Sequence, residues 1–210
     1  AYADTRMGAT MDAYLNGYSD PRLATYFKPC EDGKYHGVRN GIAAITKEYY
    51  LGMSVPNVDK TTPVRWLMSS EVAFLRAEGA MRGWAMGGDA KTFYNKGIEL
   101  SFLENGLSAA QAATYAESEA KPAAFEDASS STTAYSIGAP SQITVKWNDG
   151  ADQEEQLERI ITQKWIAMFP NGQEAWSEFR RTGYPKIFPI VHDRSNGTVD
   201  VNEQIRRMTF

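Results

Sequence analysis

Few side chains in this sequence are of the types that catalyse reactions or bind metals. The two histidines, His36 and His192, have no carboxylates or thiolates around them at the spacing of a metal site. No motif joins the single cysteine, Cys30, to a base, so we interpret it as a buried or half-buried structural thiol. We therefore predict no catalytic residue, no bound metal and no cofactor, and we expect that the chain is not an enzyme.

Two further patterns look like ligand sites but lack the required spacing. An acidic run suggests calcium, yet it departs from the EF-hand loop; its members are Asp149, Asp152, Glu154 and Glu155. Residues 83–92 contain glycines and end in Lys-Thr, but Asp89 and Ala90 separate the last glycine from Lys91, so they do not match a phosphate loop. We interpret the first pattern as a helix start and the second as a turn between helices.

Residues 28–63 form a long segment without a regular pattern and with frequent glycine and proline. Loops of this length are uncommon inside a compact domain and are often functional. The segment concentrates polar and aromatic side chains that are able to contact a ligand, namely Tyr35, His36, Arg39, Asn40, Tyr49 and Tyr50.

The composition is that of an ordinary globular chain. Its 210 residues, 42% hydrophobic and 23% charged, are enough for one sizeable core or two small ones. The net charge of −4 provides no basic surface for nucleic acid. No apolar run approaches the ~20 residues of a transmembrane helix, and the first residues lack the features of a signal peptide. The chain is then either a soluble intracellular protein or a piece of a longer one.

Helical patterns dominate the elements that must position the long segment. The clearest, residues 69–106, predicts two antiparallel helices that are separated at Gly87-Gly88 and capped by Asp89, a pair of the size of a tetratricopeptide repeat. Further helices are predicted at 3–17, 21–27, 108–119, 153–168 and 171–182, with a helical turn at 203–207.

Other positions complete the predicted fold. Residues 143–147 (ITVKW) predict a short strand. Helical spacing places Trp84, Trp165, Trp176 and Phe179 in the core, and Trp66, just before the helix at 69, is expected there too. Lys164 is expected to extend its amino group to solvent from a buried stem. Since no strand–helix–strand alternation appears, we predict an all-α fold with long irregular loops.

Five stretches, in order, resemble the SusD/RagB family of outer-membrane nutrient-binding lipoproteins, and most of all its SusD-like branch. Each is modest evidence alone, but together they cover about residues 20–190 and are specific. They are 20–27 (DPRLATYF), 69–80 (SSEVAFLRAEGA), 88–98 (GDAKTFYNKGI), 163–169 (QKWIAMF) and 171–185 (NGQEAWSEFRRTGYP).

The resemblance implies a fold and a function. Family members use tetratricopeptide-like helix pairs as a scaffold and irregular loops as the ligand site. They are lipid-anchored on the extracellular face of the outer membrane, where they cap a SusC-type TonB-dependent transporter and hold glycans, or in some members peptides, for import. For this chain it implies binding of an oligo- or polysaccharide and delivery to such a transporter.

The chain departs from the family at its start. Full members begin with a lipoprotein signal and an anchoring cysteine, followed by several more helices, and the sequence shows none of these. We therefore expect a C-terminal portion, with 1–210 as a single SusD-like region. Its helical scaffold covers about 69–118 and 153–183, and its candidate ligand segment is 28–63.

A sugar site needs aromatic faces for the C–H surfaces and directed hydrogen bonds for the polar edges. Segment 28–63 supplies both, so we place ligand contact at the six side chains named above. Glu174, Arg180 and Arg181 belong to the last matching string, and ion pairs that tie the last helix to its neighbours explain them at least as well as ligand contact does.

Two other classes of function stay open. A helical-repeat module for protein partners, or a peptide-binding protein, predicts a large exposed apolar or aromatic patch. A carbohydrate-active enzyme predicts two carboxylates that face each other across a cleft, and we rank it below the others.

Overall fold

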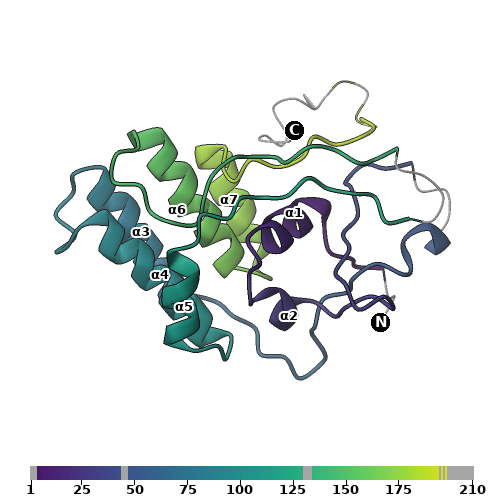
Figure 1. The fold of residues 1–210 in the computed structure, drawn as a ribbon, viewed down its shortest axis with the longest axis horizontal. Helices are drawn as coiled ribbons and strands as arrows, with labels where there is room; N and C mark the ends of the chain where they lie inside the picture. Colours follow the sequence, from purple (N-terminus) through teal and green to yellow (C-terminus); the bar gives the residue numbers. More distant parts are fainter. Residues whose placement is uncertain (1–3, 44–46, 130–133, 194, 196, 198–210) are drawn as a thin grey trace. The chain divides into compact units, whose positions relative to one another are not determined.

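The computed structural model describes residues 4–43, 47–129, 134–193, 195 and 197. In these residues every regular element is a helix, and strand pairing is limited to isolated bridges, which confirms the predicted all-α class. The chain divides into two compact units (Figure 1): unit 1 comprises Ala1–Thr61, Pro122–Gln142 and Lys186–Phe210, and unit 2 comprises Thr62–Lys121 and Ile143–Pro185. The predicted scaffold falls in unit 2, and residues 28–61 of the candidate ligand segment fall in unit 1. That 1–210 acts as a single region stays a prediction.

Unit 2 consists of two adjoining helix pairs and one short helix. Its elements are α3 (Ser69–Met81), α4 (Ala90–Glu104), α5 (Ala109–Ala116), α6 (Gln153–Ala167) and α7 (Gly172–Thr182). Helix α3 packs on α4 and α6, α4 also contacts α5 and α6, and α6 contacts α7. The pairs α3–α4 and α6–α7 form the tetratricopeptide-like scaffold that the sequence predicts.

Most helices of unit 2 begin at a residue whose side chain caps the helix. In four of them the cap accepts a hydrogen bond from the backbone N–H three residues later, which satisfies a donor that the helix itself leaves unpaired. Ser108 and Gln111 complete a full capping box. The four caps are Asp89, Ser108, Asp152 and Asn171.

The segment 143–147 is a correction to the sequence analysis, because it is buried but is not a strand. Ile143, Val145 and Trp147 alternate into the core as a strand would. Their neighbour is a helix, however: the Tyr94 hydroxyl of α4 donates to the Val145 carbonyl, and the Tyr94 and Trp147 rings lie 5.3 Å apart. The alternating pattern therefore predicted burial correctly and pairing wrongly, since no neighbouring strand is present in the described residues.

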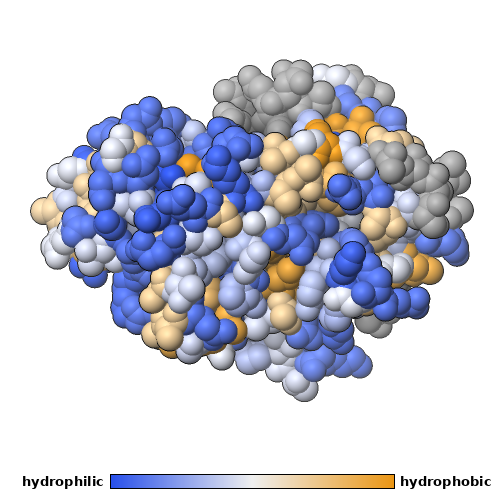
Figure 2. All heavy atoms as spheres, viewed as in Figure 1, coloured by the Kyte–Doolittle hydropathy of each residue, from blue (hydrophilic) through white to orange (hydrophobic). Residues whose placement is uncertain are grey.

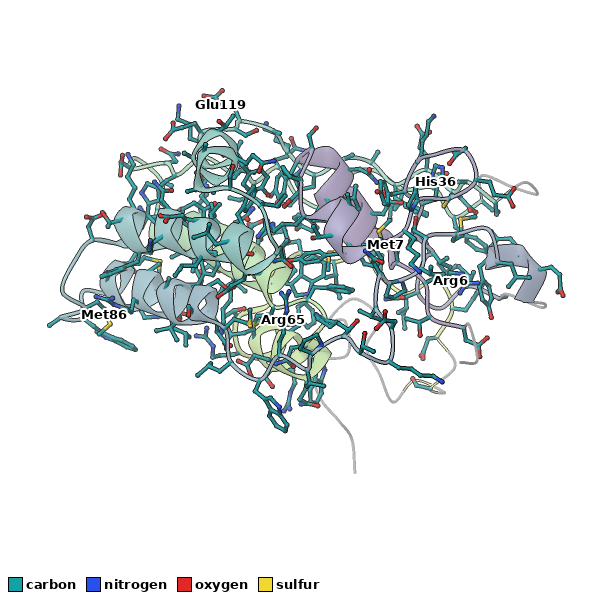
Figure 3. The ribbon with its side chains drawn as sticks, turned by 90° about the horizontal axis from the view of Figure 1, so that it is seen from below. Arg6, Met7, His36, Arg65, Met86 and Glu119 are labelled. Atoms are coloured by element: carbon teal, nitrogen blue, oxygen red, sulfur yellow. The ribbon has the colours of Figure 1, made fainter. Side chains whose placement is uncertain are left out.

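Two tryptophans expected in the core are exposed. Helix α3 ends at Met81, so Trp84 lies beyond the helical register and is 62% exposed. Trp66 is 87% exposed, because Arg65 instead turns inward and donates to Asn105 Oδ1 and the Glu104 carbonyl at the end of α4 (Figure 3). Of the other three aromatic residues expected in the core, Phe179 is buried, whereas Trp165 and Trp176 are only half-buried.

Unit 1 contains little regular structure. Its elements are α1 (Ala9–Gly17), α2 (Leu23–Tyr26) and the 3-10 turn η1 (Lys47–Tyr50). The helix predicted for residues 3–17 begins only at Ala9, because the residues just before it are extended and pair with Val38.

Two interactions organise the core of unit 1. The buried Asp20 carboxylate accepts hydrogen bonds from both the backbone and the guanidinium of Arg22, which is also fully buried. The Tyr14 hydroxyl donates to the Lys186 carbonyl, and this bond ties α1 to the C-terminal segment.

None of the helices in the described residues combines the length and apolar character needed to cross a membrane. The helical turn predicted at 203–207 lies outside the described residues.

Gly97 provides a test of the α3–α4 contact. A Cβ atom at this position would lie 2.7 Å from the Phe74 ring, so the two helices meet where α4 has no side chain. We expect Gly97→Ala to lower the free energy of unfolding by about 1–3 kcal/mol, measured by urea denaturation, since the buried Phe74 has to shift. Gly172→Ala, where a Cβ atom meets nothing within 4 Å, should leave stability unchanged or slightly raised. Equal effects of the two variants would contradict this packing.

Candidate functional site

The candidate ligand segment is held in unit 1 by backbone pairing with distant parts of the chain. The Val38 N–H donates to the Met7 carbonyl, and the Ala9 N–H returns a bond to the Val38 carbonyl. Further along the segment, the Val191 N–H donates to the Asn40 carbonyl, and the His192 N–H donates to the Gly41 carbonyl. These bonds place residues 38–41 between the segment that precedes α1 and the C-terminal segment.

Arg39 is the most buried of the six predicted ligand residues, with 7% exposure. Its guanidinium donates to the Tyr135 carbonyl at 3.0 Å and the Pro189 carbonyl at 2.8 Å, and it lies 5.2 Å from the Phe188 ring centre. Its Nε has no hydrogen-bond partner in the described residues, and burial lowers the pKa of the side chain. Arg39 therefore holds three segments of unit 1 together, and only its edge is available to a ligand.

A small pocket of about 210 Å³ lies beside Arg39. Three of the six predicted residues line it, namely Arg39, Asn40 and Tyr50. Asn40 is exposed and Tyr50 half-buried. The pocket therefore combines an amide, a guanidinium and an aromatic ring, which are the groups that sugar recognition requires.

The pocket also contains residues that the sequence analysis missed. Asp4, Arg6 and Met7 line it from the extended segment before α1 (Figure 3 labels Arg6 and Met7). The Arg6 Nε donates to the Tyr50 carbonyl at 2.9 Å, and the guanidinium carbon lies 5.7 Å from the centre of the Tyr50 ring. No local pattern identifies these residues, because they join the site only through pairing with a segment some thirty residues away in the chain.

The other three predicted residues do not line this pocket. The His36 ring is 2.8 Å from Asp32, its backbone N–H donates to Ser54, and neighbouring Tyr35 is half-buried. The Tyr49 hydroxyl donates to Asp127 at 2.7 Å, and its ring packs edge-on against Tyr135. Burial raises the pKa of Tyr49. Local contacts account for His36 and Tyr49, and a ligand role for the three residues stays a prediction.

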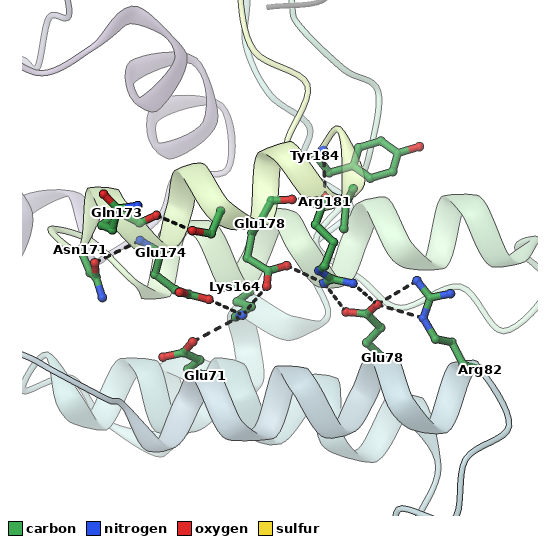
Figure 4. Close-up of polar contacts among 12 residues, drawn as sticks. Glu71, Glu78, Arg82, Lys164, Asn171, Gln173, Glu174, Glu178, Arg181 and Tyr184 are labelled. Atoms are coloured by element: carbon green, nitrogen blue, oxygen red, sulfur yellow. Dashed lines mark hydrogen bonds and ion pairs between the residues drawn. The ribbon is translucent and has the colours of Figure 1, made fainter. Parts of the chain in front are cut away.

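Unit 2 contains a cluster of charged side chains around Lys164 (Figure 4). Lys164 is 1% exposed, which corrects the expectation that its amino group reaches solvent. Its Nζ lies 3.0 Å from Glu178, 3.5 Å from Glu71 and 3.6 Å from Glu174. The stem is too deeply placed between three helices for the amino group to leave, so the helices supply carboxylates instead.

A second centre of this cluster surrounds Glu78. Both of its oxygens accept hydrogen bonds from Arg181 at 2.6 Å, and one of them also accepts from Arg82. Arg181 reaches Glu178 as well, so the two centres form one network across α3, α6 and α7.

The chain matches a family model, described as SusD-like, SusD and RagB outer membrane lipoprotein, over residues 1–210. The chain belongs to this family. It is also similar to many solved members. A chitin-binding SusD homologue from Flavobacterium johnsoniae is 40% identical over 100% of this chain and 44% of its own, with a TM-score of 0.92. A SusD homologue from Bacteroides thetaiotaomicron is 49% identical over 89% of this chain and 40% of its own, with a TM-score of 0.83.

This chain thus spans less than half the length of these solved relatives. No protein among those with curated descriptions matches it. The family assignment confirms the resemblance drawn from the sequence, and it agrees with an outer-membrane protein with an all-α fold.

The SusD-like sequence strings correspond to the charged network rather than to the pocket. The string at 171–185 supplies Glu174, Glu178 and Arg181, and the string at 69–80 supplies Glu71 and Glu78. Glu174 pairs with Lys164 and Arg181 pairs with Glu78 between helices, as the ion-pair interpretation predicts, whereas the guanidinium carbon of Arg180 lies 4.4 Å from the centre of the Trp176 ring. The six ligand candidates lie outside these strings, in the long loop segment.

The pKa of Glu78 results from opposing effects. Burial raises it, but the hydrogen bonds from Arg181 and Arg82 together outweigh burial, so that the net pKa lies below its usual value. A carboxyl with a lowered pKa in the folded state stabilises the fold above its unfolded pKa, and this stabilisation is lost as the pH falls through the folded pKa.

We expect Glu78→Gln to lower the free energy of unfolding at pH 7 by about 2 kcal/mol, because it weakens a mostly buried ion pair whose arginine is partly exposed. The difference from the unchanged protein should begin to shrink as the pH falls below the ordinary glutamate pKa of about 4.5, and should vanish once the pH has fallen through the lower pKa of Glu78 in the folded state, where its carboxyl becomes protonated. Urea denaturation at several pH values measures both effects. In the exposed Lys96–Glu99 pair, Glu99→Gln is the control and should cost less than ~0.5 kcal/mol. A pH-independent difference for Glu78→Gln would refute the assignment.

Proposed function

We propose that this chain is part of a cell-surface glycan-binding protein, and that the pocket formed by Arg6, Arg39, Asn40 and Tyr50 contacts the sugar. The observation that supports the proposal is that three of the six predicted ligand residues, Arg39, Asn40 and Tyr50, line one pocket in a chain of the SusD-like family. In the same proposal, the protein is lipid-anchored on the extracellular face of the outer membrane and passes the glycan to a SusC-type TonB-dependent transporter.

The chemistry of the pocket suits a hydroxyl-rich ligand. Arg6 and Arg39 carry hydrogen-bond donors, Asp4 carries acceptors, and Asn40 carries both. Tyr50 adds a ring whose position Arg6 stabilises. At about 210 Å³ the pocket accommodates roughly one sugar ring, so a longer glycan would extend beyond it.

The pocket supports binding better than hydrolysis. Glycoside hydrolysis generally uses two carboxylates on opposite sides of the scissile bond. Among the described residues that line the pocket, Asp4 is the only one with a carboxylate. We therefore propose that the glycan is bound without being cleaved.

Chitin oligosaccharides are the first ligands to test, because the Flavobacterium johnsoniae homologue is chitin-binding and is similar over the whole of this chain. The experiment is affinity electrophoresis and calorimetry with the full-length protein against a polysaccharide panel that includes chitin oligosaccharides. Product analysis by mass spectrometry follows each incubation. Binding with unchanged glycan length supports the proposal, and shortened products would overturn its non-catalytic part.

The assignment of the pocket is tested by Tyr50→Ala, which removes the ring but retains the carbonyl that accepts from Arg6. We expect the dissociation constant to rise roughly tenfold or more, since loss of a stacking ring costs on the order of 1 kcal/mol and loss of its contact area adds to this. Trp66→Ala and Trp84→Ala are controls that remove exposed aromatic rings from unit 2 and should leave affinity unchanged. If a tryptophan variant loses affinity and Tyr50→Ala does not, the site lies in unit 2 and our assignment is wrong.

A further inference from the structure

Arg39 differs from the other buried basic side chains of this chain in the partners that it has. Among the described residues, the buried basic side chains are Arg22, Arg39, Arg159 and Lys164. In the other three, a carboxylate oxygen lies 2.6–3.0 Å from a nitrogen of the basic group. Arg39 donates only to two backbone carbonyls, and no acidic side chain in the described part of the chain lies within ion-pair distance of it.

The contacts of Arg39 stabilise its positive charge without neutralising it. Removing a charge from water is costly unless it is paired, and a carbonyl is a weaker partner for a guanidinium than a carboxylate is. The Phe188 ring, 5.2 Å away, attracts the cation but carries no net charge. Desolvation lowers the pKa of Arg39, and its Nε has no acceptor in the described residues. These observations together favour an anionic partner beside Arg39.

The pocket beside Arg39 contains more positive than negative charge. Its charged lining residues are Arg6 and Arg39, which are basic, and Asp4, which is acidic. Arg6 resembles Arg39 in that backbone carbonyls accept hydrogen bonds from each of its three nitrogen atoms. Asp4 is exposed, so solvent screens its charge, whereas the charge of the buried Arg39 is screened much less. A ligand group in the pocket is therefore attracted if it is negative, even without a direct bond to the Arg39 Nε.

We infer that the sugar bound in this pocket is acidic, with its carboxylate on the side of Arg6 and Arg39. The inference rests on the proposed glycan binding and specifies the class of glycan. A uronic acid combines a carboxylate with several hydroxyls on one ring. The carboxylate matches the fork of a guanidinium, and the hydroxyls suit the Asn40 amide and the Asp4 carboxylate.

The molecular surface also favours a polar ligand over an apolar partner. On the face shown in Figure 2, strongly hydrophobic side chains of the described residues form small separate groups among hydrophilic ones. A module that binds protein partners through apolar contact predicts a large contiguous patch, and the described residues of this face do not show one.

The test compares each acidic ligand with its own neutral form, so that the protein itself stays unchanged. The full-length protein is titrated by calorimetry with oligosaccharides of galacturonic, glucuronic and mannuronic acid and with the methyl ester of each. Chitin oligosaccharides are the uncharged reference. We expect at least one acid to bind roughly tenfold or more tightly than its ester, because charge-assisted hydrogen bonds are about twice as strong as neutral ones. Raising the salt from about 0.05 M to about 0.5 M should weaken binding of the acid severalfold and binding of the ester little.

Two matched variants test the location of the acidic group and leave both arginines in place. Asp4→Asn removes the acidic side chain of the pocket, so it should tighten binding of the acid by roughly two- to fivefold and leave binding of the ester unchanged. Glu99→Gln, the control, removes the carboxylate of a partly exposed ion pair on α4 in unit 2, and it should change neither affinity.

The outcomes separate this inference from the proposed function on which it rests. Equal affinity for acids and esters, or a preference for chitin oligosaccharides, would overturn the inference and leave glycan binding intact. Acid binding that responds neither to salt nor to Asp4→Asn would place the acidic group elsewhere and would overturn it as well. If no glycan of the panel binds, the proposed function fails together with the inference.

Discussion

The position of Lys164 constrains how α3, α6 and α7 are arranged in unit 2. Its amino group is buried and lies within 3.6 Å of carboxylates from Glu71, Glu174 and Glu178. Removing a charge from water is costly unless its partners are placed well, so an arrangement that separates α6 from α3 or from α7 deprives this buried charge of one or more of its carboxylate partners. Buried ion networks in general add little net stability over apolar packing, and we infer that this one acts mainly by disfavouring other placements of the three helices.

The same constraint explains why α7, the most polar helix of the scaffold, docks at all. It buries Phe179 and Glu178, and Arg181 continues the network to Glu78 on α3. After α7, Gly183 adopts a left-handed conformation (φ 81°), and the next residue, Tyr184, donates a hydrogen bond to Glu154 at the start of α6. Polar contacts thus hold both ends of α7. A purely apolar helix would be held only by the packing of its apolar side chains.

Unit 1 achieves a defined geometry by a different route. With only short helices, it relies on backbone pairing between distant segments and on buried arginines that donate to carbonyls or to a neighbouring aspartate. Arg39 and Arg22 are the clearest cases. Loops held in this way are able to present Asn40 and Tyr50 in fixed positions, which is what a preorganised binding site needs.

Local patterns in the sequence determined the helices, their caps and the family. Asp89 caps its helix as predicted, and Ser108, Asp152 and Asn171 cap theirs in the same way, because a cap involves only the next three residues. The tertiary structure alone decided whether the 143–147 segment pairs or packs, whether Trp66 and Trp84 are buried, and where the amino group of Lys164 lies. It also decided which loop residues share a pocket and brought in Arg6, since such contacts depend on segments far apart in the chain, whose meeting no local pattern encodes.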